Sequence, residues 1–220
     1  ADKVADEIKA AGGQAVANYD SVADAKSAAN IVKTAVDSFG TVDIVVNNAG
    51  VLRDKTFHNM TTEDFDFVVK VHFQGTAYVT HAAWPILRAK AYGRVVVTSS
   101  NSGIYGTFGQ ANYGGAKLAV VGFMNALRLE GQKYNIFINA LAPVAATRMT
   151  ESLMTPEVLD KLRPEFVSPM VAWLCSEQCQ RTGDIWSAGA GTFARIEYRE
   201  APGLRIEGRV GTSKIPPNQI

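Results

Sequence analysis

The stretch that decides the fold is TSSNSGIYGTFGQANYGGAK, residues 98–117. It follows the apolar run GRVVV, has two serines directly after its first residue, and ends with a tyrosine and a lysine four residues apart. A short apolar run bounded by polar residues predicts a buried strand. The spacing of the tyrosine and the lysine puts both side chains on one face of a helix. The stretch therefore predicts a strand, a polar turn and a helix, which is one repeat of an α/β fold.

The same alternation of strands and helices continues on both sides of this stretch. Continuously apolar strands separated by helices are typical of a parallel sheet covered on both faces. We therefore expect the α/β class, with a Rossmann-like, doubly wound parallel sheet. The expected strands are 14–20, 42–50, 93–100, 136–143 and one near 184–189. The expected helices are one at the start of the chain, one over about 21–38, a long one capped by Thr61 or Thr62, one that carries the Tyr-Lys pair, and one over about 156–176 with a break.

The composition narrows the function. The 220 residues are 47% hydrophobic and 20% charged, with a formal net charge of +1. Such a chain has no basic footprint for nucleic acid, and no apolar run approaches the roughly 20 residues of a membrane-spanning helix. The histidines and cysteines show no metal-ligand spacing. We expect no nucleic-acid partner, no membrane and no metal.

Tyr113 and Lys117 can form a proton-transfer unit. A phenol has a pKa near 10, which is too high for a good base at neutral pH. A nearby ammonium and a helix N-terminus both favour the phenolate. Ser100, at the end of the preceding strand, could hold a substrate oxygen beside the phenol. The pattern suits an alcohol/carbonyl reaction, although a Tyr-x-x-x-Lys pair alone is usually a surface pair on an amphipathic helix.

Several motifs together resemble the short-chain dehydrogenase/reductase family. They are NNAG at 47–50, a serine 13 positions before the tyrosine, Tyr-x-x-x-Lys, and NALAPVAATRM at 139–149. The resemblance implies that Tyr113 is the general acid/base, that Lys117 lowers its pKa and holds the nicotinamide ribose, and that Ser100 orients the substrate oxygen. It also implies a nicotinamide cofactor, NAD, with NADP not excluded. The implied cofactor-binding residues are Asp20, Ser21, Asn48, Ala49, Gly50, Tyr113, Lys117, Pro143, Val144 and Thr147.

A narrower resemblance is to the (3R)-hydroxyacyl-CoA dehydrogenase domains of the peroxisomal multifunctional β-oxidation enzymes of type two. It rests on NNAGVLRDKTF, SSNSGIYGTFGQANY, TRMTESLM and VAWLCSEQC. It implies NAD-dependent oxidation of a (3R)-3-hydroxyacyl-CoA to the 3-ketoacyl-CoA, with an enoyl-CoA hydratase fused to the domain or working with it. The location would be peroxisomal in a eukaryote and cytoplasmic in a bacterium. The alternatives are a hydroxysteroid dehydrogenase, a 3-ketoacyl-carrier-protein reductase, or a non-catalytic dehydrogenase-like dimerisation module.

The chain departs from the family pattern in three places. The usual catalytic asparagine is His72, which could contact a backbone group, bind a proton-relay water, or simply pack in its helix. The usual Pro-Gly is Pro143-Val144, so the backbone at Val144 must be ordinary. The first βαβ unit, with its glycine-rich pyrophosphate loop, is absent. Because its strands would lie beside strand 14–20, we expect a further N-terminal segment in the natural polypeptide.

Domain organisation and assembly follow from the same pattern. We expect a dehydrogenase domain over 1–198, N-terminally incomplete, and an extension or linker over 199–220. Two long helices carry more apolar residues than one buried stripe needs, which predicts a homodimer through them. The residues behind this expectation are Val68, Val71, Phe73, Val120, Phe123, Met124 and Leu127. Arg53 and Asp54 either shape the mouth of the site or pair on the surface.

Overall fold

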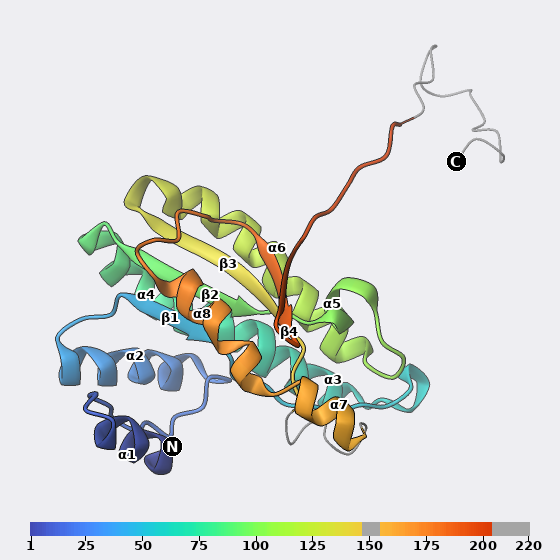
Figure 1. Ribbon diagram of the computed structural model, residues 1–220, viewed down its shortest axis with the longest axis horizontal. Coiled ribbons are helices and arrows are strands. Elements are labelled where there is room, and N and C mark those ends of the chain that lie inside the picture. Colours follow the sequence, from blue (N-terminus) through green and yellow to red (C-terminus); the bar gives the residue numbers. More distant parts are fainter. Residues whose placement is uncertain (147–154, 204–220) are drawn as a thin grey trace.

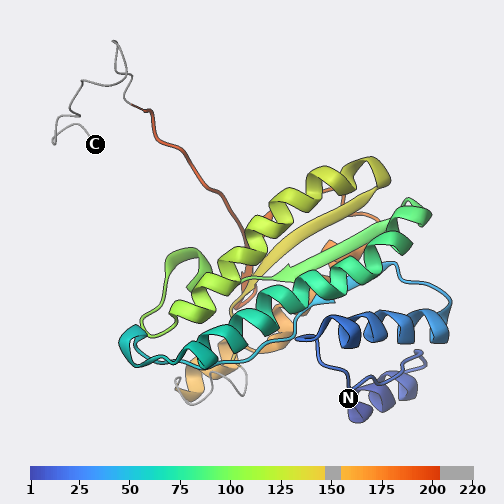
Figure 2. The same cartoon turned by 180° about the vertical axis from the view of Figure 1, so that it is seen from behind.

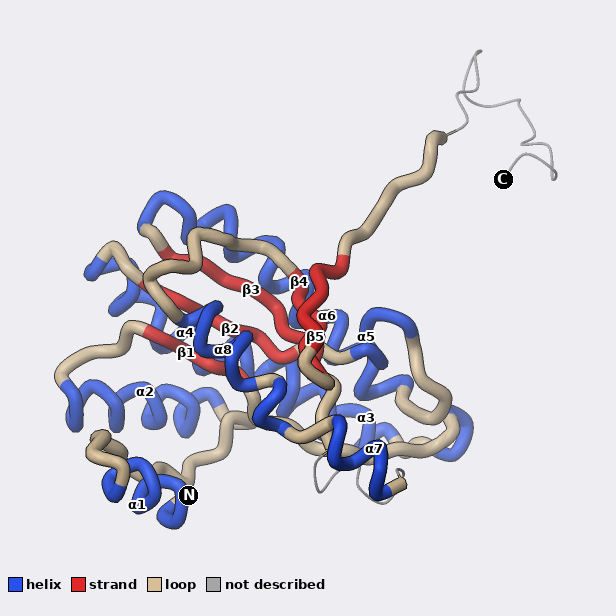
Figure 3. The backbone as a smooth tube through the Cα atoms, viewed as in Figure 1, coloured by secondary structure: helices blue, strands red, loops and turns tan. Residues whose placement is uncertain are grey.

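A five-stranded sheet forms the centre of the computed structural model, which describes residues 1–146 and 155–203 (Figure 3). The strand order is β1-β2-β3-β4-β5. Strands β1 to β4 run parallel, and β5 runs antiparallel to β4. The expected α/β class with a mostly parallel sheet is confirmed. The strands are β1 Ile44–Asn47, β2 Gly93–Thr98, β3 Ile136–Pro143, β4 Ile185–Gly189 and β5 Thr192–Ile196.

Helices cover both faces of the sheet. Helices α4 and α6 pack on one face and α8 packs on the other, as the two opposite views show (Figures 1 and 2). No helix within the described ranges is both long and apolar enough to cross a membrane. The α-helices of these ranges are α1 Asp2–Ala10, α2 Ala25–Phe39, α3 Thr62–Val69, α4 Gly75–Lys90, α5 Asn101–Tyr105, α6 Ala111–Gly131, α7 Pro156–Lys161 and α8 Ser168–Cys175. Shorter helical turns are η1 Phe57–Asn59, η2 Lys70–Gln74, η3 Gln132–Tyr134 and η5 Pro164–Phe166.

The side chains of β2 alternate between two cores. Val95 and Val97 belong to the larger core, beneath α4 and α6, whereas Val96 belongs to the core beneath α8. This follows from the period of two in a strand. All six residues of β2 are buried, because both faces of the strand are covered. The continuous apolar run in the sequence has this physical cause.

Capping residues fix the starts and ends of the helices that flank β1. The Thr61 hydroxyl accepts a hydrogen bond of 3.1 Å from the Asp64 amide at the start of α3, as expected for an N-cap. Asp24, and not Ser21, caps α2 by accepting from the Ser27 amide at 2.8 Å, so α2 starts later than expected. Gly40 ends α2 with a φ of 82°, a conformation that favours glycine.

The expected strand over 14–20 is wrong. These residues are not in a strand, and β1 is the edge of the sheet within the described part of the chain. A strand needs a neighbour for its backbone hydrogen bonds, and here the segment lies against α2, where Asn18 donates to Thr34 at 2.9 Å. On β1, Ile44 and Val46 each stay 45% exposed.

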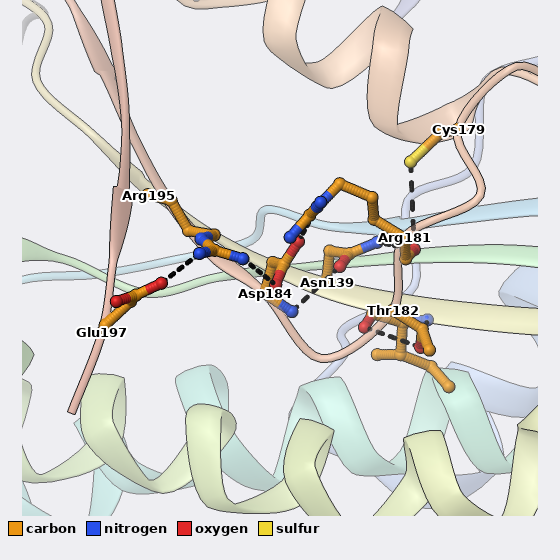
Figure 4. A network of polar contacts seen from close by, with 8 residues as sticks. Asn139, Cys179, Arg181, Thr182, Asp184, Arg195 and Glu197 are labelled. Carbon is orange, nitrogen blue, oxygen red and sulfur yellow. Dashed lines mark hydrogen bonds and ion pairs between the residues drawn. The ribbon is translucent and has the colours of Figure 1, made fainter. Parts of the chain in front are cut away.

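Strand β5 was not expected from the sequence. It forms a hairpin with β4 through Ala190 and Gly191, both at positive φ, which is the conformation of a type I′ turn. Asp184, just before β4, forms ion pairs with Arg181 and with Arg195 of β5, the latter at 3.8 Å (Figure 4). Asn139 of β3 accepts from the Asp184 amide at 3.1 Å. The hairpin is thus fastened to the sheet by polar contacts.

The apolar excess of the two long helices is largely internal. Val68, Val71, Val120 and Met124 are all buried within the chain, so they cannot form a subunit interface. The reason is that α3, η2 and α6 pack on one another as well as on the sheet. The exposed apolar residues of these helices are others, such as Leu118 and Leu129.

Candidate active site

Polar residues gather at the carboxyl ends of the parallel strands. Asn47 ends β1, and Ser100 comes two residues after the end of β2. At the same edge β3 ends on Pro143, one of the residues expected to bind the cofactor. The first two strands are paired in register, with Asn47 opposite Val97. Ligands of open α/β sheets bind at this edge, so the site lies where the fold predicts it.

Ser100 holds a hydroxyl beside the Tyr113 phenol. Ser100 is the N-cap of the short helix α5, and its oxygen accepts a hydrogen bond of 3.2 Å from the Ser102 amide. The Ser100 side chain also acts on the phenol of Tyr113, near the start of α6, where it favours a lower pKa of that phenol. Helix α5 itself was not expected, since the sequence predicts only a polar, glycine-rich turn here. The turn therefore fixes the serine more firmly than a loop would.

Lys117 is a buried cation one helical turn after Tyr113. Its ammonium donates to the Thr98 carbonyl at 2.6 Å and lies 5.6 Å from the centre of the Tyr113 ring. The Ser99 hydroxyl donates to the Lys117 carbonyl at 2.7 Å, which ties α6 to the end of β2. Burial lowers the pKa of Lys117 to about 8, because an ammonium loses hydration in the interior.

The pKa of Tyr113 departs from expectation. Burial raises the pKa of Tyr113 above its ordinary value, the hydrogen bond from Ser100 opposes this rise, and the Asp54 carboxylate adds to it. A lowered pKa was expected from Lys117, but Lys117 is not among the groups that shift this phenol. The physical reason is that the ammonium is directed at the Thr98 carbonyl, while desolvation disfavours the phenolate.

His72 lies against Tyr113 in a π-helical turn. This turn, η2, joins α3 to α4, and such turns are frequent at functional sites. The two rings meet edge to face with centroids 5.1 Å apart. His72 Nε2 is 3.1 Å from the amide nitrogen and 2.8 Å from the carbonyl oxygen of Val51. Burial, aided by the Lys117 charge, lowers the pKa of His72 to about 4, so its ring is neutral at physiological pH.

One imidazole nitrogen of His72 has no hydrogen-bond partner in the described part of the chain. Nδ1 is buried and accepts or donates no hydrogen bond within the described residues. A buried polar atom of this kind has a cost unless a water or ligand satisfies it. Gly50 packs on the same ring, and a Cβ at position 50 would lie 2.6 Å from His72 Cε1. The Asn-Asn-Ala-Gly segment therefore reaches the histidine through a residue without a side chain.

Asn48 and Ala49 line a cavity of about 110 Å³ beside β1. Val22 from the segment before α2 and Gly75 from the start of α4 line the same cavity. Asp20 and Ser21 adjoin it but do not line it: Asp20 accepts from Asn18 at 3.0 Å, and Ser21 accepts from the Ala23 amide at 3.2 Å. The structure thus brings Asn48 and Ala49 to a hollow and leaves Asp20 and Ser21 in a local turn beside it.

The segment after β3 is joined to β4. The Val144 amide donates to the Ala188 carbonyl at 2.8 Å, next to Pro143. Val144 is not among the described non-glycine residues at positive φ, which are Ala91, Asn135 and Ala190. The expected ordinary backbone at Val144 is therefore confirmed. Thr147 lies outside the described residues.

Two residues that sequence reasoning did not single out hold Tyr113 in place. Asn112 is fully buried, and its amide donates to the Arg53 carbonyl at 3.1 Å while its oxygen accepts from the Tyr113 amide at 2.7 Å. Gln110 bridges Asp54 and Ser102. The sequence feature that could have pointed to them is the pair of amide side chains just before the tyrosine, in QANY at 110–113. Asp54 therefore belongs to the site mouth, whereas the Arg53 side chain pairs with Asp64 on the surface.

A hydroxyl, a phenol and a buried ammonium at the strand ends of an α/β sheet define a candidate oxidoreductase site. The sequence profile of the short chain dehydrogenase family matches residues 1–157 of this chain. The chain therefore belongs to the short chain dehydrogenase family, which is a family of oxidoreductases.

Two relatives and one solved structure narrow the comparison. A short-chain type dehydrogenase/reductase of Mycobacterium tuberculosis is 58% identical over 89% of this chain and 68% of its own length. Peroxisomal multifunctional enzyme A of Dictyostelium discoideum is 50% identical over 94% of this chain and 46% of its own length. The structure of full-length peroxisomal multifunctional enzyme type 2 from Drosophila melanogaster has a TM-score of 0.80 at 36% identity, over 93% of this chain and 35% of that one. The chain spans less than half of these multifunctional relatives.

Proposed function

We propose that this chain catalyses the NAD-dependent oxidation of a (3R)-3-hydroxyacyl-CoA to the 3-ketoacyl-CoA in fatty-acid β-oxidation. The observation that carries the proposal is the convergence of Ser100, Tyr113 and Lys117 at the strand ends. Its specificity for acyl-CoA rests on the likeness to multifunctional peroxisomal enzymes.

Tyr113 acts as the base in the direction of oxidation. The substrate hydroxyl is held between the Ser100 hydroxyl and the phenolate of Tyr113, which takes the hydroxyl proton as the C3–O bond becomes a carbonyl. The hydride leaves C3 with its electron pair, and a bound nicotinamide supplies the acceptor at its C4. Reduction runs the same steps backwards, with the phenol as the acid. Because burial raises the pKa of Tyr113, oxidation should speed up toward alkaline pH.

Lys117 and His72 support the phenol from two sides. In this structure the ammonium of Lys117 donates to the Thr98 carbonyl. We assign it the role of turning to the phenolate and the nicotinamide ribose when the cofactor is bound, since an opposite charge favours the ionised form. His72 stays neutral and packs edge to face on the tyrosine ring. Its free Nδ1 is suited to a water that passes the proton outward. His72 would thus replace the asparagine that is usual in the family.

The residues present fit part of a nicotinamide dinucleotide. The hollow lined by Asn48 and Ala49, directly before Gly50 in the chain, suits part of the dinucleotide, and we assign Asn48, Ala49, Gly50, Tyr113 and Lys117 to its binding. We assign Pro143, Val144 and Thr147 to the nicotinamide half and Asp20 with Ser21 to the adenine end. The glycine-rich pyrophosphate loop is not in this sequence. NAD is the proposed cofactor by the likeness to β-oxidation enzymes, and NADP is the alternative.

Domain, assembly and location are proposed with the same reasoning. Residues 1–198 form the dehydrogenase domain, and 199–220 form an extension or linker. The chain works as a homodimer, with exposed apolar residues of α6 such as Leu118 and Leu129 in place of the buried ones first expected. It also works together with a hydratase, since its longer relatives include a peroxisomal hydratase-dehydrogenase-epimerase. The location is peroxisomal if the source is eukaryotic, and cytoplasmic if it is bacterial.

Turnover of defined substrates tests the proposal. Full-length protein is assayed with NAD or NADP and with (3R)- or (3S)-3-hydroxyacyl-CoA of C4 to C10. A hydroxysteroid with NAD or NADP, and a 3-ketoacyl-carrier protein with NADH or NADPH, are tested as alternative substrates. The expected result is NAD reduction with the (3R) series alone. A preference for the steroid or for the carrier protein would mean that this compound, and not an acyl-CoA, is the substrate class. No turnover of any of them, with Tyr113→Phe behaving identically, would favour a non-catalytic module.

A further inference from the structure

A chain of directed hydrogen bonds connects Asp54 to the turn that holds Ser100. The Gln110 amide nitrogen donates to Asp54 at 2.6 Å, and its oxygen accepts from the Ser102 hydroxyl at 2.7 Å. The Thr107 hydroxyl donates in turn to Ser102 at 2.9 Å. We call Asp54, Gln110 and Ser102 the carboxylate–amide bridge.

The Asp54 carboxylate sets the direction of every bond in this bridge. An ionised carboxylate only accepts hydrogen bonds, whereas an amide can donate at one end and accept at the other. Asp54 therefore holds the nitrogen of Gln110, which leaves the amide oxygen for Ser102. Asp54 has no ion-pair partner among the described residues, because the neighbouring cations Arg53 and Lys55 both pair with Asp64. Its charge thus acts on the bridge and on the site behind it.

The bridge ends at the catalytic hydroxyl. Ser102 lies in the first turn of α5, and its backbone amide donates to the Ser100 oxygen at 3.2 Å. This bond uses one of the two lone pairs of the Ser100 oxygen and leaves its proton for the phenol or a substrate oxygen. A second tie, from the Lys55 amide to the Gly109 carbonyl at 3.0 Å, holds the two loops together. Gly109 itself has a φ of 79°, a conformation that favours glycine.

We propose that Gln110 is a positioning residue for the proton-transfer pair: oriented by Asp54, its amide fixes the Ser102 hydroxyl and so holds the turn that presents Ser100 to Tyr113. This inference rests on the proposed function. Asp54 then has two separate effects on the proton-transfer pair. One is positional, through the bridge. The other is electrostatic, because its charge raises the pKa of Tyr113. The other ionisable groups that face the phenol are Lys117 from α6 and His72 from η2.

Three variants and two controls test the bridge. The variants are Gln110→Leu, Asp54→Asn and the double variant. Gln180→Leu and Asp37→Asn are the matched controls, since each removes an exposed amide or carboxylate away from the site. Rates with NAD and a (3R)-3-hydroxyacyl-CoA are measured across pH. The phenol of Tyr113 is titrated by NMR with carbon-13 tyrosine and assigned with Tyr113→Phe.

Each single variant should lower kcat about tenfold, the equivalent of one net hydrogen bond, with KM changed much less. The double variant should be no worse than either single one, because both act on the same bridge: Gln110→Leu removes its amide, and Asp54→Asn removes the carboxylate that fixes the direction of its bonds. Asp54→Asn should also move the phenol titration and the pH–rate profile to lower pH, by about half a unit for a partly screened charge. The controls should leave both readouts as in the wild type.

Additive losses in the double variant, or wild-type kcat in Gln110→Leu, would overturn the bridge. So would a phenol titration that Asp54→Asn leaves unchanged. That last readout does not need turnover. If the wild type reduces neither NAD nor NADP while the phenol titration still shifts, the proposed reaction is what fails, and the electrostatic effect of Asp54 on the phenol stands.

Discussion

Acid should destabilise this protein through His72. Its pKa of about 4 in the folded chain compares with about 6.5 in an unfolded chain. Between these values the unfolded state binds the proton and the folded state does not, so folding stability falls as pH falls through this window. The full difference of about 2.5 pH units corresponds to about 3 kcal/mol. About 2 kcal/mol of this should be lost between pH 7 and pH 4.5.

Urea unfolding at these two pH values measures the loss. Because acid also protonates carboxylates, the wild type is compared with His72→Asn, whose amide can still reach Val51. His81→Asn, an exposed histidine on α4, is the control. His72→Asn should lose about 2 kcal/mol less than the wild type on acidification, and the control should lose as much as the wild type. An equal loss in all three proteins would refute the burial of a neutral His72.

Two further substitutions test the surroundings of the phenol. Lys117→Met should cut kcat/KM by at least about a hundredfold. It should also raise the free energy of unfolding by about 1 to 2 kcal/mol at pH 7, because it removes an ammonium that burial disfavours and loses only the bond to Thr98. Enzyme kinetics and urea unfolding measure the two effects, and a less stable variant would contradict the cost of burying this ammonium. Gly50→Ala should destabilise by about 1 to 3 kcal/mol, since its Cβ would lie 2.6 Å from His72 Cε1; thermal unfolding checks this, and an unchanged midpoint would mean that the histidine moves freely.

Local sequence patterns were enough for most of the fold. Strand β3 was expected at residues 136–143 and is found there, because a strand buried on both faces must be continuously apolar. Thr61 and Gly40 marked helix ends for reasons internal to the helix. Strand 14–20 shows the limit of such patterns. An apolar segment becomes a strand only beside another strand, and its own sequence does not supply that neighbour.

The candidate site, like the fold, has features that could be predicted from the sequence and features that could not. The spacing of Tyr113 and Lys117 and the position of Ser100 were legible, because each follows from one element. The contact between His72 and Val51 spans 21 residues and depends on a π-helical turn, which no periodicity marks. The raised pKa of Tyr113 is a consequence of burial, and burial is a property of the packed chain. Charge spacing alone therefore predicted the wrong direction.

The direct test of the proposed chemistry is kcat/KM of Tyr113→Phe with NAD and a (3R)-3-hydroxyacyl-CoA at alkaline pH. The phenol oxygen is the only atom removed, and Phe keeps the ring that packs on His72. Loss of a general base of this kind lowers the rate by about a hundredfold to ten-thousandfold, with little change in stability expected. A Tyr113→Phe variant that oxidises the substrate at the wild-type rate would contradict the role of Tyr113 as the base.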